Sequence, residues 1–306
     1  MHQTFDQRNK NIKVFIGGKL YFREDAKVSV FDSSVQGGDA VWEGLRIYNG
    51  RIFCFDKHVN RLQESAKTLM FTDIPTREYI RDAVIQTLNS NGMKDEAHIR
   101  LTLTRGDKIT SGMDPRLNQN GSCLIVLAEW KKPVYDNQSG IILITSHIRR
   151  NSSQNLDSKI HHNNLLNNIL AKIEANYCNA DDAIMLDNYG FVAETNATNI
   201  FMVKNGELHT PNAGACLPGI TRGLVIDIAK ELDINCKERN ISISEFYNAD
   251  EVFTTGTMGE LTLVKEIDGR KIENKSKSDL LGKIYKRFKK LTETEGEKLT
   301  FLKKKF

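Results

Sequence analysis

The sequence predicts an α+β protein built in two parts, and three features lead to this prediction. Asn49-Gly50 stands between two apolar strands, which is a strong hairpin signal. The stretch 165–177 carries apolar residues at helical spacing. A polar, proline-containing segment at 131–140 separates the halves. We therefore expect a smaller N-terminal α/β domain at 1–130, a linker at 131–140 and a larger C-terminal domain at 141–306.

The elements of the N-terminal part follow from local patterns. Gly17-Gly18 predicts the turn of a first hairpin over 14–22. Asp56 is expected to cap a helix that runs through 59–70 with apolar residues on one face. Apolar and polar residues alternate strictly over 98–104, which predicts a strand with one buried face. The other elements expected here are a helix at 77–91 and an apolar strand at 123–127.

The C-terminal part combines short strands with further helices. Pro218-Gly219 precedes a predicted helix at 221–232, and Asn205-Gly206 predicts a hairpin turn. The other elements expected are strands at 141–145, 183–186, 192–194, 199–203 and 251–255, and a final helix at 279–291. Hairpins mixed with helices are typical of the α+β class.

Composition and charge exclude several classes of protein. The 306 residues include 43 Lys and Arg against 39 Asp and Glu, and a net charge of +4 is too balanced to indicate nucleic-acid binding. The basic residues near the C-terminus fit a solvated helix face and a chain end. No apolar run approaches the roughly 20 residues of a membrane span. We therefore expect no nucleic-acid and no membrane partner.

The cysteines and the N-terminus indicate a cytoplasmic protein. Five cysteines are scattered along the chain, and none forms a C-x-x-C pair. This pattern fits reduced thiols in a reducing compartment. The first residues are polar and lack the apolar core of a signal peptide.

Leu217-Pro218-Gly219-Ile220-Thr221-Arg222 is a candidate phosphate site because it opens a predicted helix. A glycine there lets the backbone approach a ligand, and the exposed N–H groups of a helix N-terminus favour an anion. An ordinary helix start, with Thr221 as its first polar residue, would explain the same sequence pattern without a ligand. The segment 255–259, which follows a strand and carries small hydroxylated residues, is a weaker candidate.

Lys159 and Glu194 form a third candidate pair. A lysine that lies between polar residues, ahead of a buried helix, could supply a desolvated amine for Schiff-base chemistry. No spacing rule selects it from the other basic residues. His161-His162 looks like a metal pair, but adjacent histidines on a strand point apart and no further ligands complete a site. We therefore expect no metal.

Taken in order, these segments resemble one family, the class IV aminotransferases, which are pyridoxal-phosphate (PLP) enzymes of fold type IV. The family includes branched-chain and D-amino-acid aminotransferases. The resemblance covers about 14–272, and the resemblance implies a two-domain, D-amino-acid-aminotransferase-like fold. The segments that carry it are Gly38–Arg46, His58–Lys67, Lys159, Gly190–Glu194 with Asn199–Phe201, Leu217–Arg222, and Asp250–Phe253 leading to Gly256-Thr257 and Glu260–Thr262.

The resemblance also implies roles for individual residues. Lys159 would bind PLP covalently and then move the proton during the reaction. Glu194 would keep the pyridine nitrogen protonated. Leu217 would pack on one face of the ring. The phosphate would be held by Arg61, by the backbone amides of Ile220 and Thr221, and by Thr257.

The implied reaction is a ping-pong transamination by a homodimer or a multiple of dimers. An amino acid, with branched-chain L-amino acids as the first guess, would leave its nitrogen on PLP, and a 2-oxo acid such as 2-oxoglutarate would collect it. The alternatives within the family are a D-amino-acid transaminase, an (R)-amine transaminase and an aminodeoxychorismate lyase. Outside it, the chain could be a catalytically silent relative that binds a phosphate ligand.

The substrate side departs from the branched-chain pattern. Those enzymes usually follow the lysine with a glycine-rich loop ending in Asn-Tyr, whereas this chain has Ile-His-His-Asn-Asn-Leu at 160–165. Asn163 or Asn164 could replace the tyrosine, and His161 or His162 could reach the site. The candidate substrate residues are Trp42, His98, Arg100 and Arg116. Such arginines would suit acidic or D-amino acids as well as leucine.

Overall fold

The computed structural model describes residues 4–135, 137, 139–274 and 279–299. The chain divides into two compact units. The N-terminal unit comprises residues up to Lys132, together with Ile160–Asn164 and the described residues from Thr292 onward. The C-terminal unit comprises Pro133–Lys159 and Leu165–Leu291. Two segments that the sequence-based division assigned to the C-terminal domain, 160–164 and 292–299, therefore pack with the N-terminal unit.

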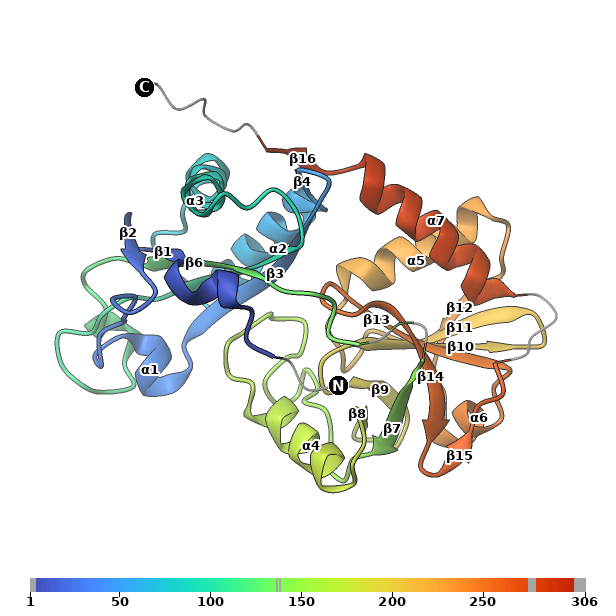
Figure 1. The fold of residues 1–306 in the computed structure, drawn as a ribbon. Coiled ribbons are helices and arrows are strands. Elements are labelled where there is room, and N and C mark those ends of the chain that lie inside the picture. Colours follow the sequence, from blue (N-terminus) through green and yellow to red (C-terminus); the bar gives the residue numbers. More distant parts are fainter. Residues whose placement is uncertain (1–3, 136, 138, 275–278, 300–306) are drawn as a thin grey trace. The chain divides into compact units, whose positions relative to one another are not determined.

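The N-terminal unit contains a seven-stranded antiparallel sheet in the order β16-β4-β3-β5-β6-β1-β2 (Figure 1). Its strands are β1 (Lys13–Ile16), β2 (Lys19–Phe22), β3 (Ala40–Tyr48), β4 (Arg51–Ile52), β5 (Ala97–Thr104), β6 (Cys123–Trp130) and β16 (Glu297–Lys298). Its helices are α1 (Ser33–Gly37), α2 (Phe55–Thr68) and α3 (Arg77–Asn91), with 3₁₀ turns η1 (Gln7–Asn11) and η2 (Pro115–Leu117). The hairpins expected at Gly17-Gly18 and Asn49-Gly50 are confirmed as β1–β2 and β3–β4.

The two faces of β5 differ as the alternation predicted. Ile99, Leu101 and Leu103 are fully buried in the core that α2 and α3 share with the sheet. His98 and Arg100 lie on the other face and are only partly covered. Polar side chains of neighbouring strands can therefore gather on this second face.

The start of α2 differs from the expectation. Asp56 was expected to cap this helix, but Cys54 is the N-cap and adopts a left-handed conformation with φ of 52°. Asp56 lies in the first turn instead, where a carboxylate is favoured by the helix dipole. The hairpin turn and the helix are so close in sequence that the chain must reverse at Cys54.

The C-terminal unit contains a nine-stranded mixed sheet in the order β12-β11-β10-β13-β14-β7-β8-β9, with β15 paired to β14 (Figure 1). Its strands are β7 (Ile141–Thr145), β8 (Asp182–Leu186), β9 (Val192–Thr195), β10 (Asn199–Lys204), β11 (Glu207–Pro211), β12 (Cys236–Arg239), β13 (Glu251–Gly256), β14 (Glu260–Ile267) and β15 (Arg270–Lys271). Its helices are α4 (Leu166–Tyr177), α5 (Ile220–Glu231), α6 (Ile243–Tyr247) and α7 (Leu280–Thr294), the last of which runs into the N-terminal unit. The pairs β11–β12, β7–β8 and β7–β14 are parallel.

Helix α4 carries an apolar stripe that faces outward. Five large apolar side chains at helical spacing are 47–90% exposed, namely Leu166, Ile169, Leu170, Ile173 and Tyr177. The opposite face buries Ala171 and Ala175 beside β8. The sequence predicted an amphipathic helix whose apolar face is buried, and this is wrong for the single chain because small residues pack inward.

The remaining global features concern thiols and membranes. All five cysteines are free thiols. Among the residues that the structure describes, no helix is long and apolar enough to cross a bilayer.

Candidate active site

Glu194 is the central carboxylate of the C-terminal unit and lies on β9, almost fully buried. Arg150 donates from Nε to Oε1 at 2.6 Å. Asn199 donates from Nδ2 to Oε2 at 3.1 Å, and the backbone N–H of Leu217 reaches Oε1 at 3.3 Å. A buried arginine beside a buried carboxylate offsets the cost of removing both charges from water. The arrangement suits a carboxylate that must stay ionised next to a ligand.

Asn199 joins this carboxylate to the segment that opens α5. Its Nδ2 also donates to the backbone carbonyl of Leu217 at 2.9 Å. Its Oδ1 lies where a Cβ at Gly219 would stand, only 2.0 Å from that position. Gly219 has an ordinary φ of −63°, so the glycine is required by space and not by backbone conformation.

The first turn of α5 has no side-chain cap. Gly219 is the N-cap residue, and within the described part of the chain no side-chain cap hydrogen bond is made to the first turn of the helix. Thr221 is buried, and Ile220 and Leu217 are half-buried. Uncapped amides at a helix N-terminus can bind an anion. The sequence left open that Thr221 is an ordinary N-cap. Thr221 does not have this role, because α5 begins at Ile220 and Thr221 is its second residue.

Lys159 and Thr257 are the other candidates in this unit. The Lys159 side chain is 47% exposed, and its Nζ lies 3.9 Å from Asp157 Oδ1. The amine is therefore not the desolvated group that the sequence suggested. Thr257 is half-buried in the turn between β13 and β14.

Arg61 lies in the N-terminal unit, where it forms a two-point ion pair with Glu43. Arg61 is on α2 and Glu43 on β3. Nε donates to Glu43 Oε1 at 2.7 Å and Nη2 donates to Oε2 at 2.8 Å. Glu43 is fully buried. Its Oε2 lies 2.6 Å from His58 Nδ1, and its Oε1 lies 3.0 Å from His161 Nδ1. The sequence alone did not predict this cluster, because its members are far apart along the chain.

The predicted substrate residues fall into two groups. Trp42, His98 and Arg100 lie on the polar face of the sheet in the N-terminal unit. Burial, followed by the nearby charges of Lys131, Arg46 and Arg100, lowers the pKa of His98 to about 3, so this imidazole is neutral near pH 7. Arg116 differs, because its side chain is 89% exposed and pairs with Asp114 two residues away.

Arg100 has an unusual environment for a partly buried arginine. Its guanidinium lies 3.9 Å from the centroid of the Trp42 ring. Its Nη2 donates to Asn163 Oδ1 at 2.9 Å. Among the described residues, no carboxylate pairs with it, whereas Arg105 pairs with Asp39 at 2.6 Å. Burial lowers the pKa of Arg100 from its usual value, which shows the cost of leaving this charge uncompensated.

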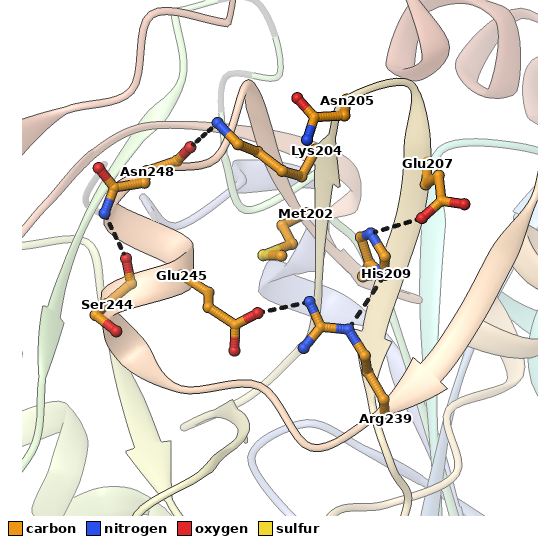
Figure 2. Close-up of a pocket in the computed structure, with 9 residues that line it drawn as sticks. All are labelled: Met202, Lys204, Asn205, Glu207, His209, Arg239, Ser244, Glu245 and Asn248. Atoms are coloured by element: carbon orange, nitrogen blue, oxygen red, sulfur yellow. Dashed lines mark hydrogen bonds and ion pairs between the residues drawn. The ribbon is translucent and has the colours of Figure 1, made fainter.

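A separate pocket of about 400 Å³ lies in the C-terminal unit, and Figure 2 shows its lining. None of the candidate residues above lines it. Arg239 pairs with Glu245 at 2.7 Å, and Lys204 pairs with Asp250 at 3.1 Å. Since these charges neutralise one another, the pocket offers no strong attraction for an ionic substrate.

Comparisons with known proteins identify the family to which this chain is similar. The family model described as amino-transferase class IV matches residues 40–267. A branched-chain-amino-acid aminotransferase-like protein of Arabidopsis thaliana is 58% identical over 94% of this chain but only 52% of its own length, so the chain spans about half of that relative. A putative branched-chain-amino-acid aminotransferase of Methanocaldococcus jannaschii is 42% identical over 94% of this chain and 99% of its own.

Solved structures show the same fold. The crystal structure of an Escherichia coli branched-chain amino acid aminotransferase is 29% identical, covers 94% of this chain and 97% of its own, and superimposes with a TM-score of 0.86. The fold is therefore the α+β fold of type IV, as the sequence predicted. From its match to the family model and its similarity to these relatives, the chain belongs to the class IV aminotransferase family.

Proposed function

We propose that this chain is a PLP-dependent aminotransferase that moves an amino group from an amino acid to a 2-oxo acid by a ping-pong mechanism. The observation that carries the proposal is the buried Glu194, held by Arg150 and Asn199, beside the uncapped N-terminus of α5. The carboxylate of Glu194 is suited to bind a protonated ring nitrogen, and the N-terminus of α5 is suited to bind a phosphate. The names of the relatives support the same activity.

The residues of the C-terminal unit fit PLP. When bound, PLP supplies an electron-accepting ring and a carbonyl carbon that exchanges amines. Glu194 would accept a hydrogen bond from the protonated ring nitrogen, and Arg150 and Asn199 would keep its carboxylate ionised and oriented. The amides of Ile220 and Thr221 and the hydroxyl of Thr257 would bind the phosphate, while Leu217 would cover one ring face.

Lys159 and Arg61 would complete the set. The Lys159 amine would hold the cofactor covalently and, once displaced by the substrate amine, would carry the proton to and from the substrate Cα. Its partial exposure fits a group that must react with incoming molecules. Arg61 would bind the phosphate while its ion pair with Glu43 holds the guanidinium in place.

We propose branched-chain L-amino acids as the first donors and a dicarboxylic 2-oxo acid such as 2-oxoglutarate as the acceptor. The names of the relatives support the donor class. Arg100 supports the acceptor class, because a covered guanidinium with no carboxylate partner among the described residues suits a second substrate carboxylate. Arg116 gives less support, since Asp114 already neutralises it.

We also propose that the chain forms a homodimer in the cytoplasm. The exposed stripe of α4 supports association, because large contiguous apolar surfaces usually mark interfaces. The free cysteines support a reducing compartment.

The first prediction concerns Lys159. The purified protein with PLP should be yellow and should be bleached by the correct class of amino donor, because the donor amine displaces the lysine. Lys159→Ala should lose the yellow band and about 10³-fold or more of the transaminase rate, since it lacks the proton-transfer group. Absorbance and a donor–acceptor screen measure both. Pyruvate formed without any acceptor would indicate the lyase instead, and a colourless wild type would contradict the proposal.

The second prediction concerns Gly219. In Gly219→Ala the new Cβ must displace the Asn199 side chain, which loosens Glu194 and the start of α5. We expect the dissociation constant of PLP to rise about tenfold or more, as for other overpacked sites. Gly223→Ala, in the same helix with open space at its Cβ, is the matched control and should bind PLP normally. Equal affinities for the two variants would contradict the predicted role of this segment.

The third prediction compares two arginines. Arg100→Gln should raise KM for 2-oxoglutarate about tenfold or more, because a charge-assisted contact is lost. KM for a monocarboxylic 2-oxo acid should change little. Arg116→Gln should leave both values nearly unchanged, because that side chain is exposed and paired. An effect of Arg116→Gln alone would exchange the roles of the two residues.

The fourth prediction tests the stripe on α4. Ile173→Lys should shift the protein from dimer to monomer, because a charge would enter an apolar contact. Tyr189→Lys, which replaces an equally prominent apolar side chain in a turn outside α4, should stay dimeric. Light scattering of the purified proteins gives the mass. If Ile173→Lys remains a dimer, the interface lies elsewhere on the surface.

A further inference from the structure

The segment that directly follows Lys159 is built into the N-terminal unit. Residues 160–164 lie along β3, where Val41 and His162 form a β-bridge. The backbone N–H of Trp42 donates to the carbonyl of His161 at 2.9 Å, and the N–H of Asn163 donates to the carbonyl of Ala40 at 2.7 Å. The loop is therefore an added edge of the sheet, and its side chains have fixed neighbours.

His161 makes two different contacts with its single ring. Its Nδ1 lies 3.0 Å from Glu43 Oε1. Because an ionised carboxylate can only accept, Nδ1 must carry the proton. On its other side, the ring lies against the Trp42 indole, with 4.2 Å between the centroids.

Glu43 connects His161 to Arg61, because both contact its carboxylate. Burial alone would raise the pKa of Glu43, but its interactions with His161, Arg61 and His58 hold that pKa well below the usual range. Each carboxylate oxygen accepts two bonds, so Oε1 is shared by His161 and Arg61. If His161 stopped donating, the carboxylate would lose one of the bonds that fix its orientation, and the guanidinium of Arg61 would lose its fixed partner.

Trp42 connects His161 to Arg100, because both lie against its indole ring. The indole Nε1 donates to the carbonyl of His162 at 3.1 Å, which fixes the plane of the ring. The guanidinium of Arg100 lies 3.9 Å from the centroid of that ring and donates to Asn163. The same five-residue loop thus supports the indole and the arginine beside it.

We propose that His161 is a positioning residue that supports the phosphate-binding arginine through Glu43 and the substrate-side arginine through Trp42. This inference rests on the proposed function, in which Arg61 binds the PLP phosphate and Arg100 binds the distal carboxylate of a dicarboxylic 2-oxo acid. The two contacts use different properties of histidine. The N–H donor serves Glu43, and the flat ring serves Trp42.

Two variants separate these properties. His161→Asn keeps a nitrogen donor close to the position of Nδ1 but removes the ring. His161→Phe keeps a flat ring against Trp42 but removes the donor. His147→Asn and His147→Phe are the matched controls, because the His147 side chain is 94% exposed.

The experiment measures two quantities on each full-length variant. The first is the dissociation constant of PLP, from a titration of the apoprotein. The second is the ratio of KM for 2-oxoglutarate to KM for a monocarboxylic 2-oxo acid. His161→Phe should weaken PLP binding about tenfold, as expected for one lost hydrogen bond to a charged group, and keep the KM ratio. His161→Asn should keep PLP binding within about twofold and raise the KM ratio about fivefold. The controls should match the wild type.

The outcomes have distinct meanings. If both His161 variants change both quantities together, or neither quantity changes, the inference is wrong and His161 only fills space. If the wild type neither binds PLP nor transaminates, the proposed function fails and this inference fails with it. Suppose that the wild type binds PLP and transaminates, but the two His161 variants do not show their separate effects on PLP binding and on the KM ratio. The proposed function then stands, and this inference alone is overturned.

Discussion

The ion pair between Glu43 and Arg61 is the interaction on which the polar side of the N-terminal unit depends. A fully buried carboxylate is costly, and it is stable here because, among the described residues, an arginine and two histidines contact both of its oxygens. Removing any one donor would leave part of a buried charge unsatisfied, which costs more than the bond contributes. The cluster therefore fixes α2, β3 and the loop 160–164 relative to one another within this unit.

The C-terminal unit also contains a buried carboxylate, which different residues stabilise. Glu194 is also buried and also pairs with an arginine, but its second oxygen is held by the neutral amide of Asn199. That amide occupies the space beside Gly219, so the identity of one glycine and the orientation of one carboxylate are linked. In each unit, a buried carboxylate in a strand is thus held by an arginine and by further nitrogen donors.

The sequence allowed correct predictions where the structure depends on neighbours in the chain. Asn49-Gly50 and the alternation over 98–104 specify a turn and a strand by local rules, and both are confirmed. The helix cap was misplaced because the left-handed conformation of Cys54 follows from the tight passage between β4 and α2 and not from its own preference. The outward stripe of α4 was misread because periodicity reveals an apolar face but not what covers it.

The candidate site was predictable only in part, and for a similar reason. Family resemblance selected Glu194, the segment from Leu217 to Arg222 and, without assigning it a role, Asn199, but the partner Arg150 carries no local signal. Glu43 and His161 are 118 positions apart in the chain, so their contact depends on the loop joining the sheet. Such contacts belong to tertiary structure, and no motif in a single sequence reports them.

The arginines of the N-terminal unit show how electrostatics can narrow the choice of substrate. Arg105 and Arg116 each have a carboxylate partner, so their charges are already balanced before any ligand binds. Arg100 is held instead by an indole face and an amide oxygen, which orient the guanidinium without neutralising it. A covered positive charge in this state is stabilised most by an incoming carboxylate. The neutral His98 beside it adds no competing charge, and Arg46, which is paired with His98 between β3 and β5, brings a second buried guanidinium to this face, so both arginines contribute to its positive charge.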